Sequence, residues 1–164
     1  MQNVDATQCA DLSGCNSANT PVFSFEGVHL VARLLDVHDG DTVTVAAEVY
    51  PGRVCQLSLR LLGIDAPEVS VPAQRERAQA ARYRLVELLT GLRVDPSRRL
   101  TRGEMRSLLQ GKVHLVHVKC GPNDKYGRVL GYVSKDIEGD HAGNVMLQEG
   151  LVNPYSGGTK LAFS

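Results

Sequence analysis

The chain has 164 residues, 43% of them hydrophobic and 22% charged, and its 18 basic side chains balance its 18 acidic ones. These values are typical of a soluble globular protein, and the length fits a single domain with a modest core. No stretch approaches the ~20 consecutive apolar residues that a membrane-spanning helix needs, so the sequence argues against a membrane protein.

The zero net charge alone gives little support for a nucleic-acid-binding protein. The charges are, however, unevenly distributed. Residues 1–48 hold seven acids and one base, whereas residues 72–106 hold nine arginines and four acids. The arginine-rich segment is either a solvated surface or a candidate basic binding surface.

Both ends of the chain have the composition of flexible tails. Residues 1–24 are rich in Ser, Asn, Thr and Gln and show little periodicity, which predicts a flexible polar N-terminal tail. The composition becomes tail-like again from Asn153, and the predicted flexible C-terminal tail spans 156–164. The first twenty residues lack a basic start followed by an apolar run, so they are no signal peptide. This favours an intracellular protein, or one whose leader was removed.

The four cysteines show no metal-binding or redox spacing, because no C-x-x-C pair is present. Cys9 and Cys15 lie in the polar tail, and Cys55 and Cys120 lie in strand-like segments. We expect all four to be unpaired. The alternative is a disulfide within the tail, if the protein occupies an oxidising compartment.

From Gly27 onward the pattern becomes that of β-strands. The turn tripeptide Tyr50-Pro51-Gly52 separates the second strand from the third. The predicted strands are residues 28–37, 41–49 and 53–62. Antiparallel hairpins in chain order favour a meander that closes into a small barrel.

After Pro72 the hydrophobic period becomes helical, in the segment AQRERAQAARYRLVELLTG (73–91). One side of this helix carries small and apolar residues that we expect in the core: Ala78, Ala81, Leu85 and Leu88. Gly91 is the expected C-terminal stop. The arginines on the other faces form the candidate basic surface.

Beyond a loop at 92–100, Thr101-Arg102-Gly103-Glu104 has the form of a capping box and predicts a second short helix. Two more strands follow at 112–120 and 128–135, and a last helix runs from Asn144, its expected N-cap, to Gly150. The predicted fold class is therefore mainly β with helices (α+β), a five-stranded OB-type barrel with about three helices.

Carboxylates gather where these strands end. VHDGDTVTV (37–45) places Asp39 and Asp41 on either side of Gly40, which suits a hairpin turn, and RLLGIDAPE (60–68) places Asp65 and Glu68 after the third strand. If these strands are neighbours, Asp41 and Asp65 face each other, and like charges need a cation or a proton to coexist. A hard cation such as Ca²⁺ is one explanation. A plain turn, with each Asp accepting nearby backbone N–H groups, is the other.

Two arginines extend this carboxylate group. Arg60 precedes Asp65 by five residues, and Arg128 follows the turn DKYG. Guanidinium groups bind phosphate bidentately and stabilise charge that develops at phosphorus. A metal ion, two arginines and a carboxylate base are the groups needed for attack of water on a phosphodiester.

The histidines are weaker candidates. His114 and His117 are three apart, which on a strand points them to opposite faces and argues against a zinc pair. His38 is either a base beside the carboxylates or a partly exposed turn residue, and we favour the second interpretation. Cys120 has no partner that would mark it as a nucleophile.

Taken in order, VHDGDTVTV, RLLGIDAPE and NDKYGRVLGYV resemble the three motifs of the staphylococcal nuclease (thermonuclease) family, over about residues 28–155. The resemblance implies an OB barrel with three helices at 25–155, between the two tails. It also implies Ca²⁺-dependent hydrolysis of DNA and RNA, with single strands preferred, by cleavage of the P–O5′ bond to leave 3′-phosphate ends. The aromatic stacking that favours single strands is general to such sites.

The same resemblance assigns the metal site. Asp41, Asp65 and the backbone carbonyl of Ala66 would bind Ca²⁺, and Asp39 would be an outer-shell carboxylate. Glu68 would act as the general base or orient the attacking water. Ala66 departs from the threonine found in some relatives, which removes a hydroxyl group but keeps the carbonyl.

The remaining carried-over residues would contact the substrate. Arg60 and Arg128 resemble the phosphate clamp. Lys125 and Tyr126 resemble the residues around the terminal phosphate of the bound nucleotide, and Tyr155 resembles a family tyrosine near the base and sugar. The segment 91–111 is longer than in compact relatives, and it either shapes the substrate groove or decorates the surface.

Three functions are compatible with these features: an active nuclease, a catalytically weak nucleic-acid-binding module of the same fold, and a structural OB domain. The presence of both aspartates, Glu68 and both arginines favours the enzyme. We expect DNA and RNA as substrates, no membrane association, no obligate protein partner and a monomer. The near-neutral charge predicts weak, salt-sensitive binding of DNA.

Overall fold

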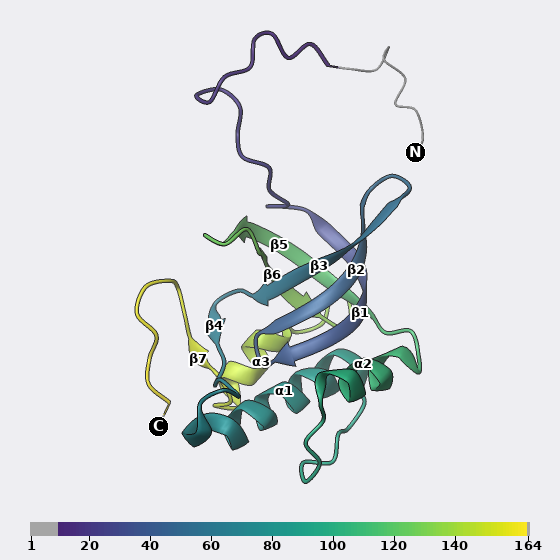
Figure 1. The fold of residues 1–164 in the computed structure, drawn as a ribbon, viewed down its shortest axis with the longest axis vertical. Coiled ribbons are helices and arrows are strands. Elements are labelled where there is room, and N and C mark those ends of the chain that lie inside the picture. Colours follow the sequence, from purple (N-terminus) through teal and green to yellow (C-terminus); the bar gives the residue numbers. More distant parts are fainter. Residues whose placement is uncertain (1–9, 164) are drawn as a thin grey trace.

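In the computed structural model, which describes residues 10–163, five strands close into a barrel in the order β1-β2-β3-β6-β5 (Figure 1). These strands are β1 (His29–Asp39), β2 (Thr42–Tyr50), β3 (Arg53–Leu61), β5 (Leu115–Asn123) and β6 (Val129–Ser134). The three helices are α1 (Arg75–Thr90), α2 (Arg102–Gln110) and α3 (Ala142–Gln148). The predicted five-stranded α+β barrel is thereby confirmed. No helix in the described part of the chain is long and apolar enough to cross a membrane.

The barrel closes through one parallel pair, which the predicted meander did not include. All other neighbouring strands are antiparallel, whereas β3 and β6 run parallel, with Leu59 opposite Val129 and Leu61 opposite Gly131. The reason is topological, because a closed ring of five strands cannot alternate in direction all the way round. One pair must be parallel, and the long connection through α1, α2 and β5 supplies it.

The core fills the barrel and the space between the barrel and its helices. The largest fully buried side chains come from strands and helices alike: Leu34, Leu59, Ile64, Leu85, Leu89, Met105, Leu109 and Met146. Figure 1 shows α1 and α2 together at one end of the barrel, with the N-terminal segment leaving the opposite end. The helices therefore close the end of the barrel where the β1–β2 turn lies.

Helix α1 follows the predicted pattern with two differences. Ala78, Ala81 and Leu85 are buried, and Gly91 ends the helix at a φ of 78°, but Leu89 rather than Leu88 is the fully buried leucine of the last turn. The prediction that the arginines of this helix form a surface was wrong for Arg82. Its buried guanidinium donates to the carbonyl oxygens of Val37 (2.8 Å) and Leu100 (3.0 Å), and so ties α1 to β1.

The other two helices begin differently from each other. Thr101 and Glu104 form the predicted capping box at the start of α2. The prediction of Asn144 as the N-cap of α3 was wrong, because the helix begins earlier and its N-cap is His141. The small residues Ala142 and Gly143 are buried at this start, and Gly143 faces the side chain of Ile64 in β4.

Two short strands form a separate pair beside the barrel: β4 (Ile64–Asp65) and β7 (Asn153–Pro154), with Asp65 opposite Asn153. A 3-10 turn, η2 (Pro72–Gln74), leads from β4 into α1. Asn153, where the sequence becomes tail-like, is thus part of a sheet. The division into a domain with flexible tails at 1–24 and 156–164 stays a prediction, and residues 1–9, with Cys9, and Ser164 lie outside the described residues.

Gly40, between the two aspartates, is required by packing and not by the turn conformation that the sequence suggested. Its φ is not positive, since it is absent from the left-handed glycines of the chain. A Cβ atom at this position would lie 2.7 Å from Cβ of Ala81 and 3.0 Å from Cβ of Ala66. The acidic turn can approach α1 only because residue 40 has no side chain and residues 66 and 81 have small ones.

We therefore expect Gly40→Ala to destabilise the protein by about 1–3 kcal/mol, as overpacking of a tight contact does. Urea unfolding of the two proteins measures the change. Gly103→Ala is the matched control, because the nearest heavy atom to its added Cβ is 4.0 Å away in exposed α2. The control should leave stability unchanged or raise it by about 0.4–1 kcal/mol. Equal stability of Gly40→Ala and wild type would contradict the packing argument.

Candidate functional site

The two aspartates predicted to face each other do so across a guanidinium group. Asp41, in the β1–β2 turn, and Asp65, in β4, are both buried. Arg60 of β3 donates from Nη1 to Oδ1 of Asp41 (2.9 Å) and from Nη2 to Oδ1 of Asp65 (3.0 Å). Arg60 is thus the positive charge that allows the two buried carboxylates to lie in one site.

The Asp41 carboxylate is held on both oxygens. Its Oδ2 accepts a hydrogen bond from the backbone N–H of Ala66 (2.8 Å), and its Oδ1 accepts one from the hydroxyl of Thr42 (2.8 Å) as well as the one from Arg60. Asp39 lies on the outer side, where its Oδ1 accepts from the backbone N–H of Asp41 at 3.2 Å. The carboxylates at 39 and 41 and the Ala66 peptide therefore lie next to one another.

Burial of Asp41 and the neighbouring charge of Asp39 raise the pKa of Asp41 to about 6. Arg60, the Ala66 N–H and the Thr42 hydroxyl act in the opposite direction. The ionised form of Asp41 is therefore harder to maintain in the folded protein than in water, and an added cation at this position would relieve it.

Lys160, which sequence reasoning missed, inserts its ammonium group into the acidic cluster. Its Nζ lies 3.0 Å from Oδ1 of Asp65 and 3.1 Å from Oε1 of Glu68. Partial burial opposes the charge of Lys160, but the hydrogen bonds that its ammonium donates to Asp65 and Glu68 raise its pKa above the ordinary value. The residue belongs to no motif and follows Gly-Gly-Thr near the end of the chain, so no sequence signal marked it.

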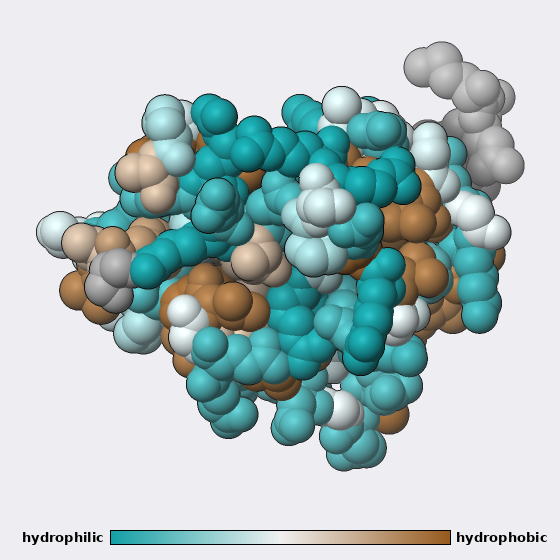
Figure 2. Space-filling view, turned by 90° about the horizontal axis from the view of Figure 1, so that it is seen from below, coloured by the Kyte–Doolittle hydropathy of each residue, from teal (hydrophilic) through white to brown (hydrophobic). Residues whose placement is uncertain are grey.

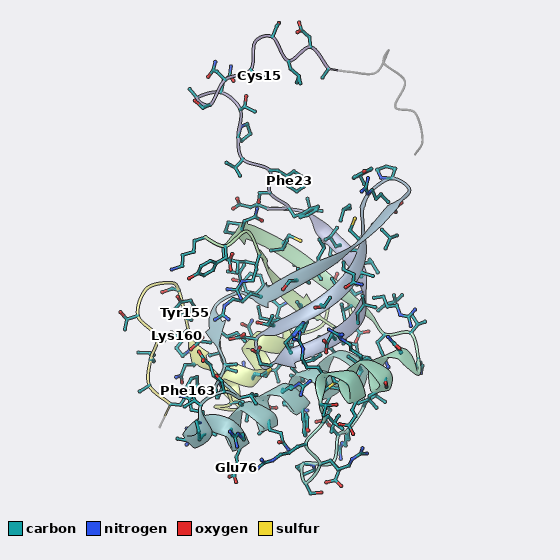
Figure 3. The ribbon with its side chains drawn as sticks, viewed as in Figure 1. Cys15, Phe23, Glu76, Tyr155, Lys160 and Phe163 are labelled. Carbon is teal, nitrogen blue, oxygen red and sulfur yellow. The ribbon has the colours of Figure 1, made fainter. Side chains whose placement is uncertain are left out.

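The segment that carries Lys160 folds back along β4. The side-chain amide of Asn153 donates to the carbonyl oxygens of Leu161 (3.2 Å) and Ala162 (3.4 Å), and the backbone N–H of Tyr155 donates to Gly63 (2.9 Å). Figure 3 shows Tyr155 and Lys160 next to each other on this returning segment, with Phe163 further along. The end of the described chain thus crosses the candidate site.

Glu68, the candidate general base, lies at the exposed rim, with about half of its side chain accessible (53%). Its backbone N–H donates to Oε1 of Gln74 (3.0 Å), which fixes the segment that follows β4. Among residues 10–163, Lys160 is the side chain that links its carboxylate to the buried part of the cluster, through Asp65.

Arg128, the second candidate phosphate ligand, stands at the start of β6 on the outer face of the barrel. Because Leu59 and Val129 are paired and buried, the neighbouring Arg60 and Arg128 both point outward from the parallel β3–β6 pair. Asp124 orients Arg128: its Oδ2 accepts from Nε of Arg128 at 2.6 Å. Asp124 is a further residue without a role in the sequence interpretation, although it lies inside the motif NDKYG.

Two tyrosines lie beside the two arginines. The ring of Tyr155 lies 5.8 Å from Cζ of Arg60, and the ring of Tyr126 lies 5.7 Å from Cζ of Arg128 and 5.0 Å from Nζ of Lys125. Tyr126 is largely exposed (73%). Among the described residues, no side-chain hydrogen bond or ion pair joins Arg60 and its partners to Arg128 and its partners. A ligand that contacts both arginines would have to bridge them.

His38 does not lie in a turn, as the sequence suggested, but inside β1 and half-buried. Its Nε2 lies 2.7 Å from the Thr44 hydroxyl oxygen, and its Nδ1 lies 2.7 Å from Nη2 of Arg102. Burial lowers the pKa of His38 from its ordinary value, although Asp36 acts to raise it. Both ring nitrogens are engaged, which argues for a structural role. His114 is buried, whereas His117 pairs with His29 on the outer face.

Whether the site suits a metal ion depends on its donor set. Within residues 10–163, no three acidic, histidine or cysteine side chains are arranged as a metal-binding group. The donors that remain are the two carboxylates of Asp41 and Asp65 and the peptide of Ala66. A hard cation accepts such oxygens and completes its shell with water. The ammonium of Lys160 stands in for a cation at Asp65, so the residues fit a positively charged ligand.

The raised pKa of Asp41 predicts how stability depends on pH. A carboxyl group whose folded pKa is above its unfolded value stabilises the protein at low pH, and this contribution is lost as the pH rises from about 4 to about 6. The variant Asp41→Asn has no ionisable group at this position, so its stability does not fall for this reason as the pH rises. With metal chelated, its Tm relative to wild type should therefore rise between pH 4 and pH 7.5, on the order of 5 °C. A difference in Tm that is independent of pH would contradict the shift.

A family model described as staphylococcal nuclease homologue matches residues 58–160. The match covers more than half of the chain and includes the motifs RLLGIDAPE and NDKYGRVLGYV, whereas VHDGDTVTV lies before it. A search among curated proteins gives no match. The barrel, the three helices and the matched segment agree with one another. The chain therefore belongs to the staphylococcal nuclease homologue family, a family of nucleases and nucleic-acid-binding proteins.

Proposed function

We propose that this protein is a Ca²⁺-dependent endonuclease that hydrolyses phosphodiester bonds of DNA and RNA, prefers single strands, and leaves 3′-phosphate ends. The observation that carries the proposal is the convergence of Asp41, Asp65 and Arg60 in one buried cluster, with Glu68 at its rim. Family membership supplies the reaction class in its coarser form, nuclease or nucleic-acid binding.

Asp41, Asp65 and the carbonyl oxygen of Ala66 would hold Ca²⁺, and Asp39 would contribute through water. Bound there, the ion would polarise a phosphate oxygen and stabilise the charge that develops in the transition state. Two carboxylates and one carbonyl leave several positions of the ion's shell to water and substrate.

Arg60 and Arg128 would bind the phosphate. A guanidinium carries five N–H donors, of which Arg60 uses two on Asp41 and Asp65, and Arg128 uses one on Asp124. The remaining N–H groups can donate to phosphate oxygens without breaking these contacts. Because the carboxylates already fix both groups, their donors are preorganised for the charge of the transition state.

Glu68 would take the proton of the attacking water. Its exposure is consistent with a group that meets solvent and substrate together, but Lys160 must first leave its carboxylate free. Lys125 and Tyr126 would contact the terminal phosphate, and the ring of Tyr155 would stack on a base, which favours unpaired nucleotides.

A second candidate function is a nucleic-acid-binding module with little catalysis. The contacts that favour it are those of Lys160 with Glu68 and of Asp124 with Arg128, because each one occupies a group that catalysis needs. A protein that only binds would retain these internal ion pairs without loss. The two functions differ in whether the pairs open when substrate and metal are present.

The first test concerns the cation site. Because Ca²⁺ would have to displace the ammonium of Lys160 from Asp65, Lys160→Met should bind Ca²⁺ roughly three- to tenfold more tightly than wild type. Titration calorimetry measures the affinity. Lys112→Met removes an exposed lysine elsewhere and should leave the affinity unchanged. Identical binding by wild type and Lys160→Met would show that Lys160 does not compete with the ion.

The second test concerns the reaction. Labelled single-stranded DNA is incubated with Ca²⁺, with Mg²⁺, or with a Ca²⁺ chelator. We expect cutting that requires Ca²⁺, 3′-phosphate ends, and no cutting by Asp65→Ala, which lacks a metal ligand. Glu68→Gln should slow cleavage by about 10²–10⁴-fold while DNA binding is kept, because only proton transfer is impaired. Bound but uncut DNA under every metal condition would establish the binding module instead.

A further inference from the structure

We infer that the start of α1 and the insertion between α1 and β5 together carry a second contact surface for the polynucleotide strand, next to the reacting centre and separate from it. The inference rests on the proposed function, since it assumes that the substrate is a polynucleotide. The surface consists of Arg75 at the start of α1 and of Arg98 and Arg99 in the loop before α2, and is called the arginine surface below. All three side chains are exposed.

The loop that carries two of these arginines is fastened to α1. The side-chain amide of Gln79 donates to the carbonyl oxygens of Pro96 (2.8 Å) and Arg98 (3.1 Å). The hydroxyl of Tyr83 donates to the same Arg98 oxygen (2.6 Å) and accepts from the N–H of Leu100 (3.0 Å). The backbone is thus held on the helix, while the guanidinium groups of residues 98 and 99 are left to the outside.

The arginine surface keeps most of its charge. Among residues 10–163, Arg75 and Arg99 form no ion pair, and Arg98 has only a long contact of 4.0 Å with Glu104. Arg84, Arg93 and Arg106 differ, because each of them forms a close ion pair with a carboxylate. Exposed guanidinium groups without carboxylate partners are free to bind phosphate oxygens.

The arginine surface begins beside the candidate site. Arg75 and Arg99 line a small hollow of about 90 Å³ together with Val69, which directly follows Glu68 in the chain. Figure 2, which views the end of the molecule where the helices lie, shows hydrophilic side chains over much of this face. A strand with one phosphate at Glu68 therefore meets positive charge at its neighbouring phosphates.

The charge distribution of the protein explains why a separate basic surface would be needed to attract a polynucleotide. The net charge is zero, and in the candidate site the four carboxylates of Asp39, Asp41, Asp65 and Glu68 outnumber the two cations that contact them, Arg60 and Lys160. Attraction of a polyanion must then come from a local positive surface. The contact with the backbone would be independent of base sequence.

The test compares Arg75→Gln/Arg99→Gln with a control that loses the same charge elsewhere, Arg53→Gln/Lys119→Gln, whose residues are exposed on β3 and β5. Binding of a 20-nucleotide single strand is measured in chelator at several salt concentrations, and hydrolysis of a dinucleotide is measured in Ca²⁺. The double variant should bind the 20-mer roughly tenfold more weakly, with a salt slope lower by about 1.4, at ~0.7 per lost contact. Its dinucleotide hydrolysis should equal that of wild type.

Two outcomes overturn the inference. If the double variant and the control bind the 20-mer alike, the arginine surface is only a solvated one. If dinucleotide hydrolysis falls with strand binding, these arginines act at the reacting phosphate. Thermal unfolding checks the fold, and the single variant Arg99→Gln, with a slope change of about 0.7, serves if the double variant is unstable. Failure of the proposed function is separate, because wild type itself would then not hydrolyse the dinucleotide.

Discussion

The contact of Arg60 with Asp41 and Asp65 is the interaction on which the rest of the site depends. It joins three parts of the chain, the β1–β2 turn, β3 and β4, through one guanidinium. Both carboxylates are buried, so without this cation Asp41 would have no basic partner in a poorly solvated position and Asp65 would keep only Lys160. The same contact leaves donors of Arg60 free and keeps the two carboxylates close enough to share a ligand. Structure and proposed chemistry therefore rest on the same three side chains.

Close packing brings the acidic turn to this position. Gly40 lies against Ala66 and Ala81 with no room for a side chain, and Arg82 of α1 bonds to the carbonyl of Val37 in the strand before the turn. The small residues of α1 thus serve the core and also hold the acidic turn at the site. A helix with a larger residue at 81 would push Asp41 away from Arg60.

The site is held together by contacts that its proposed function has to open. Lys160 covers Asp65 and Glu68, whereas Asp124 holds Arg128. Such internal partners replace solvent and keep charged groups paired while no ligand is bound. A cation or a phosphate must therefore replace one partner of an existing ion pair rather than enter an empty site. Ligand affinity then depends on where the segment that carries Lys160 lies.

By itself, the sequence determined the features that depend on neighbours along the chain: the strand and helix segments, the Thr101–Glu104 capping box, the Gly91 helix end and the grouping of acidic motifs. These signals are local, so they can be interpreted without a fold. Tertiary structure alone decided the parallel closure of the barrel, the burial of Arg82, the packing role of Gly40 and the contact of Lys160 with Glu68, 92 residues away. These four features depend on which segments distant in the sequence contact each other. Hydrophobic periodicity and turn residues report only on local structure, so they do not predict such contacts.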